Sequence, residues 1–72
     1  MYKLARLRDL RHDKDLRQED VAKMLSTTKQ QYSLWEQGKR EIPVHKLIIL
    51  ARFYNVSLDY IVGMIDDPRP LV

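Results

Sequence analysis

The apolar residues of this chain recur every three or four positions, which is the period of amphipathic helices packed on a common core. Leu4, Leu7 and Leu10 are separated by arginine and aspartate residues and predict a first helix from about Tyr2 to His12. The polar run HDKD then interrupts the pattern. The three leucines therefore form the inner face of the first predicted helix.

A second, shorter helix is predicted from about Gln18 to Leu25. Glu19 and Asp20 occupy its first turn, where the positive end of the helix dipole favours carboxylates. One face carries apolar residues with a small residue among them: Val21, Ala22 and Leu25. Because the small residue leaves room, another helix can approach this face closely.

A third helix is predicted from about Lys29 to Gln37. Thr28 is placed to cap it by accepting a hydrogen bond from a free backbone amide. Gly38 ends it, because glycine readily adopts positive φ. Tyr32 and Trp35 are three residues apart, a spacing that favours an inner, core-facing side over stacking on nucleic-acid bases.

The second and third helices, hinged at residues 26 and 27, have the layout of a helix-turn-helix. Outside its inner face, the third helix and the residues that follow it are rich in hydrogen-bond donors: Lys29, Gln30, Gln31, Ser33, Gln37, Lys39 and Arg40. These residue types bind base edges and phosphates. The pattern therefore favours binding of duplex DNA over a merely solvated helix face.

Pro43 opens a fourth predicted helix and Asn55 ends it. Its inner stripe consists of Leu47, Leu50, Ala51 and Tyr54. Ser57 caps a last short helix, whose inward residues are Leu58, Ile61 and Val62. The expected fold is thus all-α, with five helices and no strands in a single domain over residues 1–65 and a short tail over residues 66–72.

The distribution of charge supports a nucleic-acid partner for the first part of the chain. The 72 residues carry a formal net charge of +3. Residues 1–40 hold ten Lys or Arg against six Asp or Glu, whereas residues 53–72 hold one Arg against three Asp. The basic surplus coincides with the helix-turn-helix, as expected if phosphates are neutralised there.

Composition argues against several other classes of protein. The chain has no cysteine, which excludes disulfides and thiolate metal sites. The longest apolar run, residues 47–51, is too short for a membrane span, and no signal sequence opens the chain. His12 and His45 lie in different elements, and no pairing of nucleophile and base is apparent. We therefore expect a cytoplasmic protein with no membrane partner, no metal, no cofactor and no enzymatic activity.

Three blocks at fixed spacing carry a resemblance to a known family: LRDLRHDKDLRQEDVAKML, YSLWEQGKR and FYNVSLDYIVG. Over roughly residues 3–63 the chain resembles the Cro-type (XRE) helix-turn-helix family, the fold of phage repressor DNA-binding domains. The resemblance implies a lambda-repressor-like domain and a bacterial or phage transcriptional regulator. It also implies binding to a double-stranded operator, usually as a two-fold dimer.

The same resemblance gives individual positions a role. The base-reading positions of the third helix are Lys29, Gln30, Ser33 and Leu34. Gln18 matches a glutamine that holds a phosphate and braces the next helix, and Gln37, Lys39 and Arg40 match a phosphate-binding loop. Arg17, Gln31 and the hydroxyl of Tyr32 are further candidate phosphate contacts. Arg11 and Glu36 match a pair that bridges the first helix to the end of the third.

Some residues depart from the family pattern. Asp15 and Ser26 stand where glycine is common, so a positive φ there would have a conformational cost. Arg17 stands where a Ser or Thr usually caps the second helix. Its guanidinium cannot accept an amide proton, although Asp20 can reach back as half of a capping box.

Residue chemistry suggests how the third helix would select a sequence. The amide of Gln30 suits adenine, Lys29 suits a guanine edge, and Leu34, at a commonly polar position, would meet a thymine methyl. One such helix covers only a few base pairs, so selective binding requires two copies of the domain.

Five apolar residues that the predicted core does not need are candidates for the dimer interface: Ile49, Met64, Ile65, Leu71 and Val72. An alternative function is that the domain is chiefly an antitoxin or an adaptor that binds another protein, and that its contact with DNA is secondary. Ile49 favours this alternative as well, because the family usually exposes lysine at this position.

Overall fold

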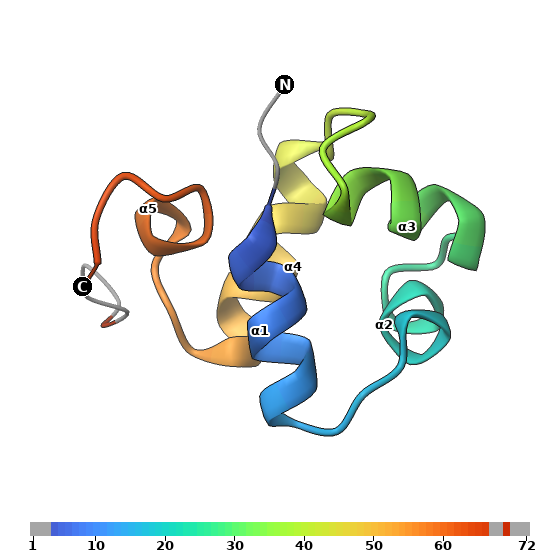
Figure 1. The fold of residues 1–72 in the computed structure, drawn as a ribbon, viewed down its shortest axis with the longest axis horizontal. Coiled ribbons are helices and arrows are strands. Elements are labelled where there is room, and N and C mark those ends of the chain that lie inside the picture. The colour runs from blue at the N-terminus through green and yellow to red at the C-terminus, as the bar shows by residue number, and fades with distance from the viewer. Residues whose placement is uncertain (1–3, 67–68, 70–72) are drawn as a thin grey trace.

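The computed structural model describes residues 4–66 and 69, and within them it contains five helices and no strand. The helices are α1 (Ala5–Asp13), α2 (Gln18–Met24), α3 (Lys29–Glu36), α4 (Val44–Tyr54) and α5 (Leu58–Ile61). Figure 1 shows α2 and α3 at one end of the molecule and α5 at the other. The expected all-α, five-helix fold is confirmed.

Side-chain caps define where two of the helices begin. The backbone amide of Gln31 donates to Oγ1 of Thr28 over 3.1 Å, and that of Tyr60 donates to Oγ of Ser57 over 3.0 Å. Each hydroxyl satisfies an amide that the first helical turn leaves without a partner. Asn55 ends α4 in the left-handed conformation, with φ of 55°. These three predictions from sequence are confirmed.

The α1 and α4 boundaries differ slightly from the predicted ones. α1 begins at Ala5 rather than near Tyr2, and residues 1–3 lie outside the described part of the chain. Pro43 precedes the first residue of α4 and has the extended conformation, with φ of −60° and ψ of 143°. A proline fits at this end of a helix because its missing amide would have no helical partner there.

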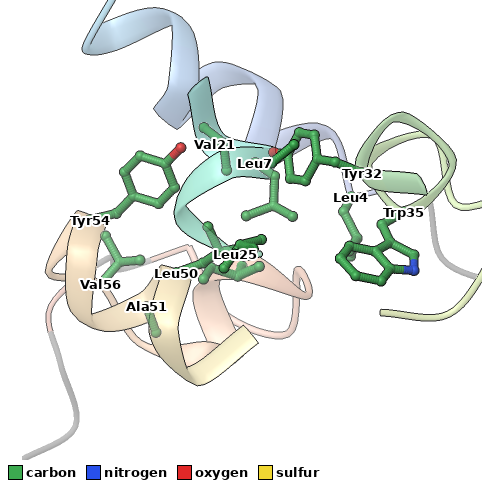
Figure 2. Packing of buried hydrophobic residues seen from close by; sticks show 12 residues of the cluster. Leu4, Leu7, Val21, Leu25, Tyr32, Trp35, Leu50, Ala51, Tyr54 and Val56 are labelled. Atoms are coloured by element: carbon green, nitrogen blue, oxygen red, sulfur yellow. The ribbon is translucent and has the colours of Figure 1, made fainter. Parts of the chain in front are cut away.

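One hydrophobic core joins all five helices (Figure 2). Its buried residues are Leu4, Leu7, Val21, Ala22, Leu25, Tyr32, Trp35, Leu50, Ala51, Tyr54, Val56 and Ile61. Leu10, Leu47, Leu58 and Val62 pack against this core while remaining partly exposed. The inner faces predicted from the helical period are therefore the faces that pack together.

Besides Asn55, two non-glycine residues in the connections between helices adopt the left-handed backbone conformation. Asp15, between α1 and α2, and Ser26, between α2 and α3, both have φ of 56°. A residue with a Cβ atom loses about 1 to 2 kcal/mol in this conformation. The glycines common in the family at these positions would avoid that cost, whereas this chain bears it at both turns.

Replacing Ser26 by Gly should raise the free energy of unfolding by about 0.5 to 1 kcal/mol. The relief of left-handed strain is about 1 to 2 kcal/mol, which exceeds the extra entropy of about 0.5 to 1 kcal/mol that glycine gives the unfolded chain. Urea unfolding measures the difference. Thr27→Gly is the matched control, because Thr27 does not have positive φ and should only be destabilised by glycine. Equal destabilisation of both variants would contradict strain at Ser26.

Candidate nucleic-acid interface

Polar side chains and one leucine lie together on the surface of the helix-turn-helix. Five side chains from α2 and α3 line a single shallow hollow, which we term the α2–α3 hollow: Gln18, Lys29, Gln30, Ser33 and Leu34. Tyr32 and Trp35, on the opposite side of α3, are buried in the core. Four of the hollow's residues are the expected base-reading positions, and the fifth is the glutamine expected to hold a phosphate.

The side chains of the hollow combine three kinds of chemistry. Lys29 and Gln30 are exposed at the start of α3, whereas Ser33 and Leu34, one turn later, are half-buried. Together they offer a cation, an amide that both donates and accepts, a hydroxyl and an apolar side chain. This is the set of groups needed to distinguish base edges in a major groove.

A buried ion pair fixes α3 relative to α1. Nε of Arg11 donates to Oε2 of Glu36 over 3.1 Å, and Nη2 of Arg11 donates to Oε1 over 2.9 Å. The Arg11 side chain is 9% exposed and that of Glu36 is 5% exposed. Nη1 of Arg11 also donates to the carbonyl oxygen of Leu16, over 3.0 Å. The pair therefore ties α1, the α1–α2 connection and the last residue of α3 together.

The electrostatics of this pair keep both groups charged. Burial acts to raise the pKa of Glu36, but the hydrogen bonds and positive charge of Arg11 outweigh it and hold that pKa below its ordinary value. The hydrogen bond to Glu36 raises the pKa of Arg11 further above neutrality. Nε2 of Gln18 lies 3.4 Å from Oε1 of Glu36, so the residue that begins α2 also touches the pair.

Tyr32 is a core residue and not part of the exposed surface. Its side chain is completely buried, and burial raises the pKa of its hydroxyl far above the ordinary value. Tyr54 belongs to the same hydrophobic core as Tyr32 (Figure 2). Burial raises the pKa of the Tyr54 hydroxyl to about 12. The phosphate contact expected for Tyr32 is therefore wrong, because this hydroxyl has no access to a ligand.

Arg17 lies at the exposed start of α2 and is engaged by carboxylates of the same helix. Its Nη1 is 3.1 Å from Oε1 of Glu19, and its Nε is 3.5 Å from Oδ2 of Asp20. The backbone amide of Arg17 donates to Oδ2 of Asp20 over 2.9 Å, which is the half capping box expected from the sequence. A phosphate at this position would therefore compete with two carboxylates for the guanidinium.

The loop after α3 holds two exposed cations on an ordered backbone. The amides of Lys39 and Arg40 both donate to the carbonyl oxygen of Leu34, over 2.9 and 3.3 Å. Nε2 of Gln37 donates to Oγ of Ser33 over 2.7 Å, which links the end of α3 to the hollow. The loop backbone is thus tied back to α3, while both charged side chains remain exposed.

One contact that supports the helix-turn-helix was not predicted from the sequence. Nζ of Lys46, in the first turn of α4, donates to the carbonyl oxygen of Leu25 at the end of α2. A cation there satisfies a free carbonyl and complements the negative end of the helix dipole. No local pattern indicates this contact, since the two residues are 21 positions apart.

The residues expected at a dimer interface lie in different settings. Met64 is 76% exposed and Ile49 is 39% exposed, whereas Ile65 is half-buried. Leu71 and Val72 lie outside the described residues. Met64 and Ile65 belong to the segment after α5, and Ile49 projects from α4, so the described candidates come from two parts of the fold.

Within residues 4–66, no helix is both long enough and apolar enough to cross a membrane. In the same part of the chain, no three or more His, Cys, Asp or Glu side chains lie close enough together to hold a metal ion.

Comparison with known proteins agrees with this geometry. A family model described as helix-turn-helix matches residues 7–61, which is more than half of the chain. The HTH-type transcriptional regulator YobD of Bacillus subtilis (strain 168) is 45% identical over 67 residues, covering 93% of this chain and 60% of YobD. The cryptic phage CTXphi transcriptional repressor RstR of Vibrio cholerae is 34% identical over 59 residues, covering 82% of this chain and 53% of RstR.

The chain thus spans between half and two thirds of the length of these curated relatives. No solved structure matches it. The matched range includes the helix-turn-helix, the buried ion pair and all the residues of the α2–α3 hollow. The chain belongs to the Cro-type (XRE) helix-turn-helix family, whose members are DNA-binding transcriptional regulators rather than enzymes.

Proposed function

We propose that this protein is a transcriptional repressor that binds a palindromic operator as a homodimer, with α3 of each copy in the major groove. The single observation that carries the proposal is the α2–α3 hollow, which gathers Gln18 and the four expected base-reading side chains on one surface. The relative RstR, which is described as a repressor, supports repression over activation.

Within this proposal, bases and phosphates are bound by different residues. Gln30 pairs with adenine through its amide, Lys29 donates to a guanine edge, and Leu34 packs against a thymine methyl. The phosphates on either side are bound by Arg17, Gln18, Gln31, Gln37, Lys39 and Arg40. Such contacts fix the orientation of α3 but carry no sequence information of their own.

The dimensions of the domain are compatible with a two-fold operator complex. Equivalent half-sites lie about 34 Å apart, so each α3 must lie about 17 Å from the two-fold axis. The domain measures 30 Å along its longest axis, with α3 at one end and α5 at the other (Figure 1). An axis passing near the α5 end therefore allows the two recognition helices to reach successive major grooves.

Selection of binding sites from random duplex DNA, followed by affinity measurements at two salt concentrations, tests the proposal. We expect an enriched site with two-fold symmetry and half-sites about one helical turn apart. The affinity should fall steeply with salt because phosphate contacts release counterions. Absence of an enriched sequence, with only salt-sensitive binding to all duplexes, would contradict the assignment of α3 as a base-reading helix.

Self-association is tested separately by sedimentation equilibrium at micromolar protein. Met64→Asp should shift the wild-type dimer to monomer, because it places a charge where an exposed apolar side chain would be buried. Met64 is preferable to Ile65 as the mutated residue, since the half-buried Ile65 also contributes to the fold. A wild-type protein that stays monomeric and binds one half-site without cooperativity would rule out the dimer.

Exposed apolar side chains on α4 favour a second candidate function, the binding of another protein. Val44, Ile48, Ile49 and Phe53 are each exposed along this helix, and apolar side chains that a partner covers would lose their contact with water. In this role the domain is an antitoxin or an adaptor, and its contact with DNA is secondary. Two results together would favour this candidate. Site selection would enrich no DNA sequence, and the Ile49→Asp variant would lose binding to the partner protein.

A further inference from the structure

Arg6, in α1, clamps the segment that follows α5. Its Nη1 donates to the carbonyl oxygen of Tyr60 over 2.8 Å and also to that of Ile65. Its Nη2 lies 2.7 Å from Oδ1 of Asp66. The guanidinium also stacks over the ring of Tyr60, with the central carbon 4.3 Å from the ring centroid. We refer to these four contacts as the Arg6 clamp.

The contacts with carbonyl oxygens and the aromatic ring are the energetically important part of the clamp. The Asp66 side chain is 99% exposed, so its ion pair with Arg6 is screened by water and contributes little. A guanidinium that bridges two carbonyls makes charge-assisted hydrogen bonds with fixed geometry, and the ring contact adds to them. Lysine lacks this planar fork and cannot reproduce the geometry.

The clamp orders a segment that has little support of its own. α5 contains only four residues. The amide of Gly63 donates to the same Tyr60 carbonyl over 3.1 Å, and the amide of Met64 donates to the Asp59 carbonyl over 2.8 Å. The amide of Val62 donates to the Leu58 carbonyl over 3.0 Å. Residues 62–66, which we term the exit segment, are therefore held by these local backbone hydrogen bonds and by Arg6 from a helix more than 50 positions earlier.

The exit segment presents Met64, which is the most exposed large apolar side chain in the described residues. The exit segment lies at the α5 end of the molecule, away from α3 (Figure 1). A partner bound there would leave the α2–α3 hollow free for DNA.

The charges around the exit segment favour a second copy of the chain as this partner. A two-fold interface must be complementary to itself. The neighbourhood of Met64 contains both signs of charge, with Arg6 close to Asp66 and Asp59 within α5. α4, by contrast, carries Lys46 and Arg52 and no carboxylate, so pairing it with its own copy would oppose like charges.

We infer that Arg6 is a positioning residue for self-association, which holds the exit segment in the conformation that presents Met64 to a second copy. The inference rests on the dimer proposed above and adds the residue that organises its surface. Arg6 need not contact the partner itself, because its effect passes through the backbone at Tyr60 and Ile65.

The test compares Arg6→Ala, Arg6→Lys and the control Arg8→Ala, which removes an exposed arginine from the same helix. Amide hydrogen exchange of residues 62–66, the dimer dissociation constant and the affinity for a single DNA half-site are measured for each. Both Arg6 variants should speed exchange in the exit segment and weaken the dimer by about tenfold or more, equivalent to about 1.4 kcal/mol. Half-site affinity should stay within about twofold of wild type, and Arg8→Ala should resemble wild type in all three measurements.

The outcomes separate this inference from the dimer proposal. A wild-type monomer at every accessible concentration would contradict the dimer itself. A wild-type dimer whose dissociation constant is unchanged in both Arg6 variants would contradict only the role of Arg6. If Arg6→Ala does not fold, Arg6→Lys decides the question, because it keeps the charge and an aliphatic stem at least as long while removing the guanidinium fork.

Discussion

Replacing Glu36 by Ala should lower the free energy of unfolding by about 3 to 5 kcal/mol. The variant leaves the guanidinium of Arg11 buried without the carboxylate that now accepts two of its hydrogen bonds. Urea unfolding monitored by circular dichroism measures the loss. Glu41→Ala, which removes an exposed carboxylate, is the matched control and should change stability by less than about 0.5 kcal/mol.

The pH dependence of the same pair provides a check on its cause. Because the folded state lowers the pKa of Glu36, the stabilisation is complete above the ordinary glutamate pKa of about 4.3 and is lost as pH falls through the lowered folded value. The difference in stability between wild type and Glu36→Gln should therefore be constant near neutral pH and shrink in acid. A Glu36→Ala melting curve identical to that of wild type would exclude a stabilising buried pair.

Replacing Gln30 by Ala should weaken binding to the preferred operator by about 1 to 3 kcal/mol and relax selection at one base step. Gln30 is exposed within the α2–α3 hollow, so its removal affects the DNA contact and not the core. Arg40→Ala should instead weaken binding to all sequences alike and reduce the salt slope by about one. Site selection and salt titration of both variants distinguish the two effects.

Arg52→Ala is the control for this comparison, because Arg52 is an exposed cation of α4 outside the proposed DNA surface. It should bind the operator like wild type at every salt concentration. Unchanged base preference in Gln30→Ala would contradict the assignment of α3 as the base-reading helix. If the DNA affinity of Arg40→Ala depends on salt as that of wild type does, the loop after α3 does not bind phosphates.

Local features of the fold were predictable because their signals lie close together in the sequence. Thr28 and Ser57 each precede a helix whose free amides lie two or three positions ahead, so their caps follow from sequence spacing. The inner faces of the helices follow from a period of 3.6 residues, which separates buried from exposed positions without knowledge of the partner helix.

Contacts between distant helices were predictable only where a family resemblance supplied them. Arg11 and Glu36 were paired on that basis, whereas the contacts of Arg6 and Lys46 were not anticipated. In a sequence, each of these cations resembles any solvated side chain on a helix. Both cations donate to backbone carbonyl oxygens, which every residue has, so composition and spacing give no indication of which carbonyl is the partner.

Two contacts that hold the helix-turn-helix originate in helices outside it. Arg11 holds the last residue of α3 from α1, and Lys46 holds the end of α2 from α4. A peptide containing only residues 18–40, or the same stretch grafted onto an unrelated scaffold, would lack both restraints. The DNA-binding motif of this protein is therefore not a transplantable module, and changing its specificity by design requires keeping α1 and α4 together with the grafted helix.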